Sequence, residues 1–406
     1  MLPDVNRDFE AAMRAFTAWY AHEAPQLRSP RQLVRETCER FVAHGVPLHR
    51  FTALLLMLHP DHFGVSHRWA RGSDEIKSSR GSYEIWNRPV LQNSPYGEIN
   101  RGAAALRRRL AGPHAQIDYD VLKDYIADGC TDYVIMHLPF SDGGRHAAAF
   151  ATDRAGGFTL AELTFIDAML PHLARQSELL TLRYLTTTLL DTYIGRKAGE
   201  RVLTGQIRRG SGETIRAVIW LSDLRGFTTL SDRLPRDALI ALLNGYFDCV
   251  GAAIDAAGGE ILKFIGDAVL AIFPLGVRYD LAVTARAAVR AAERARAGLG
   301  ELRKLPGGAG LDFGVALHVG DVMYGNIGTA QRLDFTVIGP AVNMTARLES
   351  LAASLGEPIL VSGEIASALG GSFASGLESV GRHPLKGMAT PVEAFRPRAP
   401  SASPSS

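Results

Sequence analysis

Polar residues interrupt apolar runs at three places in the second half of this 406-residue chain. Asp223 ends the apolar run in AVIWLSDLRGFT, and Lys263 and Asp267 stand inside EILKFIGDAVLAIFP. Asn343 and Arg347 follow in TVIGPAVNMTAR. Carboxylates suit hard divalent cations, whereas lysine and arginine suit phosphate oxygens. Together these residue types could hold a metal ion beside a phosphate-bearing ligand.

Asp223 is predicted to end a strand, and the loop after it is predicted to open a helix near Thr228. The backbone N–H groups of such a loop and the helix dipole favour an anion. A carboxylate at this place could therefore hold a metal next to phosphates. A strand-end aspartate that only caps the following helix is the alternative interpretation.

Gly266 is predicted to be the turn of a hairpin, with Asp267 at its tip and Lys263 within the first strand. The neighbours of the lysine are Ile, Leu, Phe and Ile, so we expect it to be buried. A buried lysine needs an acceptor, and a ligand could be that acceptor. A surface salt bridge between Lys263 and Asp267 is the alternative, but it would contribute little.

A helix is predicted after the turn at Gly339-Pro340, and it carries Asn343 and Arg347 four residues apart, on one face. The fork of an arginine suits phosphate, and an asparagine amide suits a ribose oxygen or hydroxyl. Lys386, in HPLKGMATPVEAF, precedes a glycine near the end of this region, and by itself it would be interpreted as a solvated surface lysine.

Composition excludes several classes of protein. The chain has 44 basic and 42 acidic residues, which gives no electrostatic basis for binding nucleic acid. Its three cysteines form no CxxC pair, so we expect buried, reduced thiols. The longest apolar run, Phe51 to Leu58, is too short to span a membrane, and the N-terminus lacks the pattern of a signal peptide. We therefore expect a cytoplasmic protein without a membrane segment.

The order of elements in residues 1–172 predicts an α+β domain. Two helices, the second capped by Ser29 with Pro30 at its first position, precede strand-like runs, and Thr159-Leu160-Ala161-Glu162 is predicted to cap a later helix. This order resembles a GAF domain, which implies a sensor or regulatory role and an unknown small-molecule or signal ligand. Three histidines within residues 59–67 are interpreted as surface residues rather than as a metal site.

Residues 173–211 are predicted to be a helical stalk and linker. Its leucines recur at steps of three and four, as in a dimer stalk or in a helix packed on its own domain. A second domain is expected over residues 212–397. The tail at 398–406 is rich in proline and serine and is expected to be disordered.

Four stretches of this second domain, in this order, resemble the class III nucleotide cyclase catalytic domain: SDLRGFT, KFIGD, TVIGPAVNMTAR and LKGMATPVEAF. The resemblance implies a ferredoxin-like α/β sandwich that works as a homodimer with active sites at the interface. It also implies conversion of ATP to 3′,5′-cyclic AMP and pyrophosphate, in intracellular signal transduction.

The family's functional residues match positions of this chain. Asp223 and Asp267 correspond to the aspartates that bind two divalent cations, Mg²⁺ or Mn²⁺. Asn343 would orient the ribose, and Arg347 would stabilise charge on the phosphoryl transition state. Lys386 would contact the terminal phosphates. The loop residues are assigned to substrate binding as well: Gly226, Phe227 and Thr228.

Lys263 and Thr336 match the two base-selecting positions. A lysine can only donate, which suits N1 of adenine, and a threonine hydroxyl can accept from the 6-amino group. The pair therefore favours ATP over GTP, with a guanylate cyclase as the alternative. Threonine at this place also resembles the subgroup that responds to bicarbonate or CO₂.

Two positions depart from the family's pattern. Pro340 stands where many members have Asp or Asn, and Leu221 stands where Phe is usual. Neither is a ligand position, so we expect tuning rather than loss of activity. A non-catalytic nucleotide-sensing or scaffolding module on a decayed cyclase fold is the alternative of a different class. It predicts the loss of at least one central residue, and this chain retains them all.

Overall fold

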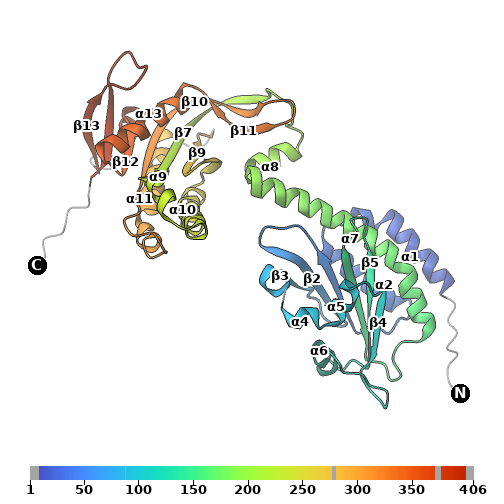
Figure 1. Ribbon diagram of the computed structural model, residues 1–406. Coiled ribbons are helices and arrows are strands. Elements are labelled where there is room, and N and C mark those ends of the chain that lie inside the picture. The colour runs from blue at the N-terminus through green and yellow to red at the C-terminus, as the bar shows by residue number, and fades with distance from the viewer. Residues whose placement is uncertain (1–8, 87, 277–279, 371–375, 399–406) are drawn as a thin grey trace, which may run out of the picture. The chain divides into compact units, whose positions relative to one another are not determined.

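The computed structural model describes residues 9–86, 88–276, 280–370 and 376–398. The chain divides into two compact units, Met1–Leu189 and Leu190–Ser406, each of which combines helices with one sheet (Figure 1). The end of the chain that we expected to be disordered lies almost entirely outside the described residues.

The N-terminal unit is built on an antiparallel sheet. Its strands are β1 (Arg50–Leu56), β2 (His62–Ala70), β3 (Lys77–Ser82), β4 (Ala105–Arg109), β5 (Asp132–Pro139) and β6 (Arg145–Thr152). Their order across the sheet is β3-β2-β1-β6-β5-β4. The sequence anticipates β1, β2, β5 and β6, because their apolar residues form short runs between turn residues. It does not anticipate the polar edge strand β3, whose sequence is KSSRGS. His62 and His67 of β2 are buried, so the interpretation of these two histidines as surface residues is wrong.

Two layers of helices cover the faces of this sheet. One face packs against α1 (Glu10–His22), α2 (Pro30–Ala43) and α7 (Leu160–Ile194). The other face packs against α5 (Pro95–Asn100) and α6 (Val121–Ala127). Short helices complete the unit: η1 (Ala24–Gln26), α3 (Tyr83–Trp86) and α4 (Pro89–Gln92).

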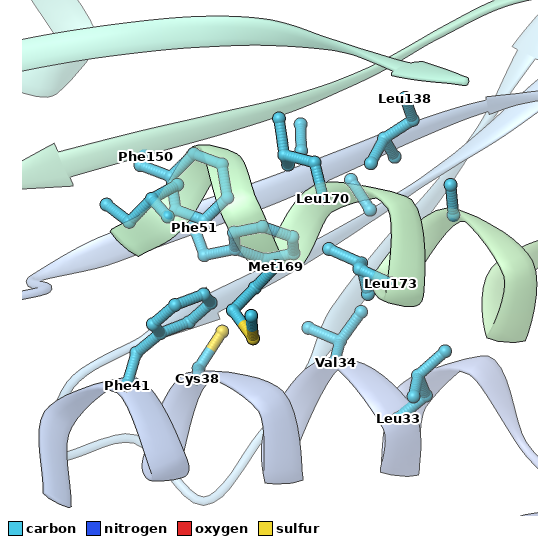
Figure 2. Close-up of a cluster of buried hydrophobic side chains, with 14 of the residues drawn as sticks. Leu33, Val34, Cys38, Phe41, Phe51, Leu138, Phe150, Met169, Leu170 and Leu173 are labelled. Carbon is cyan, nitrogen blue, oxygen red and sulfur yellow. The ribbon is translucent and has the colours of Figure 1, made fainter. Parts of the chain in front are cut away.

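The larger core of this unit lies between α2, α7 and the sheet, as Figure 2 shows. Val34 and Cys38 of α2 and Met169 of α7 pack toward Phe51 and Phe150 of the strands, and all five are buried. Burial of one such apolar side chain contributes about 1.5–3 kcal/mol. Burial also raises the pKa of the Cys38 thiol well above its ordinary value, which leaves the thiol protonated and unreactive.

The predicted helix caps are present. Ser29 Oγ accepts a hydrogen bond from the N–H of Arg31 at 3.2 Å, with Pro30 as the first residue of α2. At the start of α7, the N–H of Glu162 donates to Thr159 Oγ1 at 3.2 Å. The N–H of Thr159 donates to the Glu162 carboxylate at 2.8 Å. This reciprocal pair satisfies two N–H groups that the helix itself cannot.

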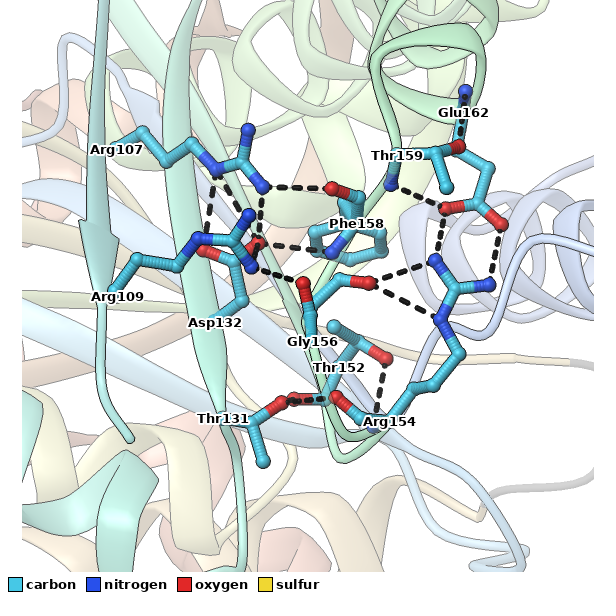
Figure 3. Close-up of polar contacts among 11 residues, drawn as sticks. Arg107, Arg109, Thr131, Asp132, Thr152, Arg154, Gly156, Phe158, Thr159 and Glu162 are labelled. Carbon is cyan, nitrogen blue, oxygen red and sulfur yellow. Dashed lines mark hydrogen bonds and ion pairs between the residues drawn. The ribbon is translucent and has the colours of Figure 1, made fainter. Parts of the chain in front are cut away.

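A network of charged groups fastens the segment before α7 to the sheet (Figure 3). The Asp132 carboxylate is fully buried; it accepts from Arg107 Nη2 at 2.6 Å and from the N–H of Phe158 at 2.9 Å. Arg109 Nη1 lies 3.3 Å from the same carboxylate. The arginines at 107–109 belong to strand β4 rather than to a helix.

Helix α7 packs on its own unit for only part of its length. Its buried residues end at Thr181, and beyond them Leu182 is 52% exposed and Tyr193 77% exposed. The sequence left two readings open for residues 173–194, a packed helix and a stalk. The structure shows one continuous helix that is buried as far as Thr181 and mostly exposed over residues 182–187, while Ile194 at its end packs against a core cluster.

The C-terminal unit contains an eight-stranded sheet. Its strands are β7 (Gly212–Leu224), β8 (Glu260–Ile265), β9 (Ala268–Pro274), β10 (Phe313–Gly328), β11 (Leu333–Ile338), β12 (Ile359–Ser362), β13 (Leu377–His383) and β14 (Val392–Pro397). The order is β13-β14-β12-β10-β7-β9-β8, with β11 paired to β10.

The helices of this unit are α8 (Arg196–Leu203), α9 (Phe227–Arg233), α10 (Arg236–Ala256), α11 (Leu281–Ala297), α12 (Leu299–Leu302), α13 (Pro340–Leu355) and α14 (Gly363–Ala368). Helices α10 and α11 share one core with the sheet. Helices α8 and α13 contribute to separate clusters with alternate residues of the same strands. The succession β7-α10-β8-β9-α11-β10, with central order β10-β7-β9-β8, has the β-α-β-β-α-β form that a ferredoxin-like sandwich requires.

Helix α10 has the length and composition of a membrane-spanning helix, with 21 residues and a mean hydropathy of 1.4 over its most apolar window. The sequence reading missed it because it counted only uninterrupted apolar runs. Five residues of α10 are buried in the core of the unit: Leu242, Tyr246, Val250, Ala253 and Ile254. A core helix of a globular domain passes the same test of length and composition.

Candidate active site

The two candidate metal-binding aspartates come together. Asp223 lies near the end of β7, and Asp267 lies in the turn between β8 and β9, where Gly266 has a φ of +64°. Strands β7 and β9 are neighbours, with Ser222 opposite Val269, so the two carboxylates meet at one edge of the sheet. Burial, followed by the hydrogen bond and the negative charge of Asp267, raises the pKa of Asp223 to about 7.

This pair of carboxylates fits a divalent cation. Two half-buried carboxylates in contact repel each other unless a proton or a cation lies between them, and oxygen ligands suit Mg²⁺ and Mn²⁺. Among the described residues no group of three or more His, Cys, Asp and Glu side chains gathers to hold a metal. The remaining ligands would therefore have to come from the backbone, water or the nucleotide phosphates.

The loop after Asp223 has the predicted form. Gly226 adopts a left-handed conformation with a φ of +70°, and α9 begins at Phe227, one residue earlier than expected. No side chain caps this helix. Its first N–H groups thus remain available to an anion, although α9 has only seven residues and its dipole is correspondingly weak.

Lys263 is not buried as the sequence predicts. Its side chain is 38% exposed, and Phe264 and Ile265 beside it are 51% and 52% exposed. The acceptor of its ammonium group is the carboxylate of Asp334 on β11, and this hydrogen bond lowers the pKa of that carboxyl. The alternative pairing of Lys263 with Asp267 is therefore also wrong.

Thr336 lies on the face of β11 that carries Asp334. Phe335 and Val337 alternate with these two residues along the strand, point to its opposite face and are buried there. Because Lys263 contacts Asp334, its ammonium group lies close to the face of β11 that carries Thr336. Asp334 is the residue that sequence reasoning missed here, because it lies 71 positions from Lys263 and no local spacing links the two.

Asn343 and Arg347 lie one turn apart on α13 and line a common cavity of about 1070 Å³. The loop that carries Lys386 approaches the same arginine, since a Cβ added to Gly387 would lie 3.3 Å from Arg347 Nη2. Lys386 itself is exposed. The first helical residue of α13 is Pro340, so this departure from the family's pattern suits the backbone position.

The site residues of one chain fall into separate groups. The cavity that Asn343 and Arg347 line includes neither Asp223 nor Asp267, and Lys263 is absent from it too. This cavity thus brings together Asn343 and Arg347 without the two aspartates and without Lys263.

A second ion pair, which the sequence reading missed, lies close to the aspartates. Arg225 Nη1 contacts Glu349 Oε1 of α13 at 2.8 Å, and both residues are mostly buried. Glu349 raises the pKa of Asp223 and Arg225 lowers it, although both effects are smaller than those of burial and Asp267. No residue spacing in the sequence links Arg225 to a helix more than a hundred positions away.

Residues 212–395 match the family described as the adenylate and guanylate cyclase catalytic domain. An adenylate cyclase of Anabaena cylindrica is 37% identical over 158 residues, which cover 38% of this chain and 31% of that protein. Adenylate cyclase 1 of Rhizobium meliloti is 33% identical over 155 residues, which cover 36% of this chain and 22% of that protein.

Among solved structures, the adenylyl cyclase CyaB from P. aeruginosa is 29% identical and covers 47% of this chain and 97% of that chain, with a TM-score of 0.41. The chain spans at most about a third of the length of the curated relatives named above. The match relates the C-terminal unit to cyclase catalytic domains, and the N-terminal unit lies outside it.

Proposed function

We propose that the protein is an adenylate cyclase, which converts ATP to 3′,5′-cyclic AMP and pyrophosphate. The observation that carries the proposal is the contact between Asp223 and Asp267 in a region related to cyclase catalytic domains. The adenylate cyclases among the relatives support this choice of activity. A decayed, non-catalytic fold would not need to preserve a repulsive pair of carboxylates.

Asp223 and Asp267 would hold two divalent cations, Mg²⁺ or Mn²⁺. When bound, such ions favour deprotonation of the ribose 3′-hydroxyl and neutralise charge on the triphosphate. The N–H groups of Gly226, Phe227 and Thr228 would donate to phosphate oxygens next to the two aspartates. This arrangement brings the oxygen that attacks close to the α-phosphorus, from which pyrophosphate leaves.

The residues around α13 would position the rest of the nucleotide. Asn343 would hold the ribose through its amide, and Arg347 would donate to the phosphoryl oxygens as their charge grows in the transition state. Lys386, on the exposed loop beside Arg347, would neutralise the terminal phosphates. All three side chains carry donors, as transfer of a highly charged group requires.

Lys263 and Thr336 would select the base. An ammonium group has three N–H donors, so Lys263 can keep Asp334 as one partner while it donates to N1 of adenine. The Thr336 hydroxyl would accept from the 6-amino group. Guanine presents a donor at N1 and an acceptor at O6, so the same two residues fit it less well.

We further propose that two copies of the chain form the active sites. The observation that supports this proposal is that the cavity lined by Asn343 and Arg347 does not include the two aspartates. The N-terminal unit, whose sheet and helices we interpret as GAF-like, would regulate the activity through α7. The protein would work in the cytoplasm.

Product formation from ATP and from GTP, each with Mn²⁺, tests the activity. An adenylate cyclase yields cyclic AMP from ATP with kcat/KM at least about tenfold above that for GTP, since one mismatched hydrogen-bonding pair costs about 1–3 kcal/mol. A preference for GTP would establish a guanylate cyclase instead. Absence of product from both would leave only a nucleotide-binding module.

A further inference from the structure

The N-terminal unit contains a cavity of about 490 Å³ that the proposed catalysis does not use. It lies between the first turn of α2, the sheet and the exposed side of α7. Its floor is apolar and consists of Leu55, Met57 and Val65. A volume of this size is within the range of about 300–1,000 Å³ typical of small-molecule sites.

The register of the sheet fixes which face this cavity occupies. Leu55 pairs with Val65, and Ala53 pairs with His67, so these side chains point to the same side. That side is the one covered by α2 and α7, because Ala53 and Leu55 belong to the core that these helices share. The cavity therefore differs from any space under α5 and α6, on the opposite face.

The rim of the cavity is cationic. Arg31 and Arg80 line it, and no Asp or Glu is among its lining residues. Arg31 Nε donates to Ser78 Oγ at 3.0 Å, and His67 Nδ1 lies 2.8 Å from the same oxygen. Within the described part of the chain, neither arginine pairs with a carboxylate.

Two other arginines of this sheet are neutralised by carboxylates, whereas Arg68 and Arg145 have no such partner among the described residues. Arg50 pairs with Asp128 at 2.6 Å, and Arg108 pairs with Asp118 at 2.8 Å. The electrostatics at His67 agree with an uncompensated positive charge: burial first, then Arg31, lowers the pKa of His67 to about 4, and no acidic group opposes them.

We propose that this cavity binds a small amphiphile with an anionic head, such as a carboxylate, and an apolar body. The head lies between Arg31 and Arg80, whose guanidinium groups donate to it, and the body covers Leu55, Met57 and Val65. Charge-assisted hydrogen bonds to such a head are about twice as strong as neutral ones. The apolar floor gains the free energy of burial only when a body of matching character covers it.

The ligand would also contact α7. Thr181 and Tyr184 line the cavity, at the point where the buried part of this helix gives way to its exposed part. Occupancy of the cavity would thus hold α2, the sheet and α7 together. Binding itself does not depend on the proposed cyclase activity and is measured without nucleotide.

Calorimetric titration of the full chain with three probes tests the proposal: octanoate, 1-octanol and octylammonium. They share one apolar chain and differ in the head. We expect octanoate to bind at least about tenfold more tightly than octanol, because it adds charged hydrogen bonds. Octylammonium is expected to show no saturable binding. Amide exchange should slow at residues 29–31, 55–57 and 181–184 when octanoate is bound.

Variants then assign the head group. The double variant Arg31→Gln/Arg80→Gln is expected to abolish the preference for octanoate over octanol. Arg35→Gln removes the same charge from α2 without touching the cavity and should keep the preference. Since all three arginines are exposed, we expect these variants to fold. If the double variant does not fold, Arg80→Gln alone tests the same point and should lose part of the preference for octanoate.

Equal affinity of octanoate and octanol would overturn the proposal. So would octanoate binding that protects only other residues from exchange. The proposal is also wrong if no probe binds, and if sedimentation shows a monomer for the double variant but a dimer for Arg35→Gln. This face would then form a contact between two copies of the chain.

Discussion

Lys263 and Asp334 form an ion pair that has little value for stability. Both side chains are more than a third exposed, and such pairs contribute only about 0–1 kcal/mol. The pair instead fixes where the ammonium group lies, beside the face of β11 that carries Thr336. A lysine held in this way needs less reorganisation to meet a base than a free one would.

Lys263 and Asp267 lie four residues apart, and we expect their substitution to impair different steps. Lys263→Glu is expected to reduce kcat/KM for ATP by roughly ten- to a hundredfold, the value of one or two lost hydrogen bonds, and to spare Mn²⁺ binding. Asp267→Ala should abolish turnover of ATP and GTP alike, because it removes half of the carboxylate pair. Steady-state kinetics with both nucleotides and Mn²⁺ calorimetry measure these effects. Identical losses in the two variants would refute this division of roles.

His67 predicts a pH dependence of stability in the N-terminal unit. Its pKa in the folded chain is about 4, below its ordinary value of 6.5, because burial disfavours the charged ring. Between these two pH values the unfolded chain binds a proton that the folded chain does not, so stability falls as the pH drops from 6.5 to 4. The loss amounts to about 3 kcal/mol.

Urea unfolding of the full chain at pH 7, 5.5 and 4.5 measures this loss. His67→Gln should reduce the fall in stability, and comparison with the unsubstituted chain cancels the contribution of the C-terminal unit. The exposed His114 provides the control, since His114→Gln should leave the fall unchanged. A fall of the same size in the His67 variant would show that another group causes it.

At the scale of elements, α7 depends on the network that holds the segment before it. The Asp132 carboxylate joins β5 to β4 through two arginines and to Phe158 through a backbone hydrogen bond (Figure 3). Thr159 and Glu162 then close the first turn of the helix. The position of α7 on the sheet is therefore set by polar contacts at its start and by apolar packing along its length.

Asp132→Asn is expected to destabilise this end of the N-terminal unit by about 2–3 kcal/mol. It leaves Arg107 and Arg109 near a neutral group that cannot compensate them, although their partial exposure reduces the cost. Amide exchange in β4, β5 and the first turns of α7 should become faster. Asp118→Asn, which removes the exposed partner of Arg108 on the same strand, should cost less than about 1 kcal/mol. Equal losses of stability in the two variants would show that Asp132 is no more important than an exposed partner such as Asp118.

At the scale of the molecule, catalysis is proposed to need two chains. Arg347 lines a cavity of the C-terminal unit that Asp223 does not line. If each site takes its aspartates from one copy and its α13 residues from the other, Asp223→Ala and Arg347→Ala should each be inactive alone. Mixed dimers should regain up to about half of the activity, because one of two sites is intact. An inactive mixture, in which dimers of both chains are shown to form, would argue that each site lies within one chain.

Local signals in the sequence predicted much of the fold but few of the polar contacts between residues that are distant in the chain. The caps at Ser29 and Thr159, the turn at Gly266 and the helix of Asn343 follow from residues within four positions of each other, and the structure contains them all. Contacts between side chains of strands that are distant in the sequence have no local signal of this kind. Asp334 as the partner of Lys263 could not be predicted, because it requires β8 and β11 to lie side by side.

The burial of Lys263 was mispredicted for a related reason. Apolar neighbours were taken to mean an enclosed strand, yet β8 is the last strand in its sheet, and Phe264 and Ile265 are exposed there. Position in a sheet depends on the order of strands, which the sequence does not state. Edge strands with exposed apolar residues are also common sites of association between chains.

Gly314 of β10 shows how an uncharged group could change the electrostatics of the aspartates. A Cβ at this position would lie 1.8 Å from Arg225 Nη2, so even alanine would push that guanidinium away from Glu349. The buried Glu349 would then face Asp223 without its counter-charge, and the pKa of Asp223 would rise further. A single uncharged methyl group would thereby control how readily the carboxylate pair releases its proton to solvent when a cation binds.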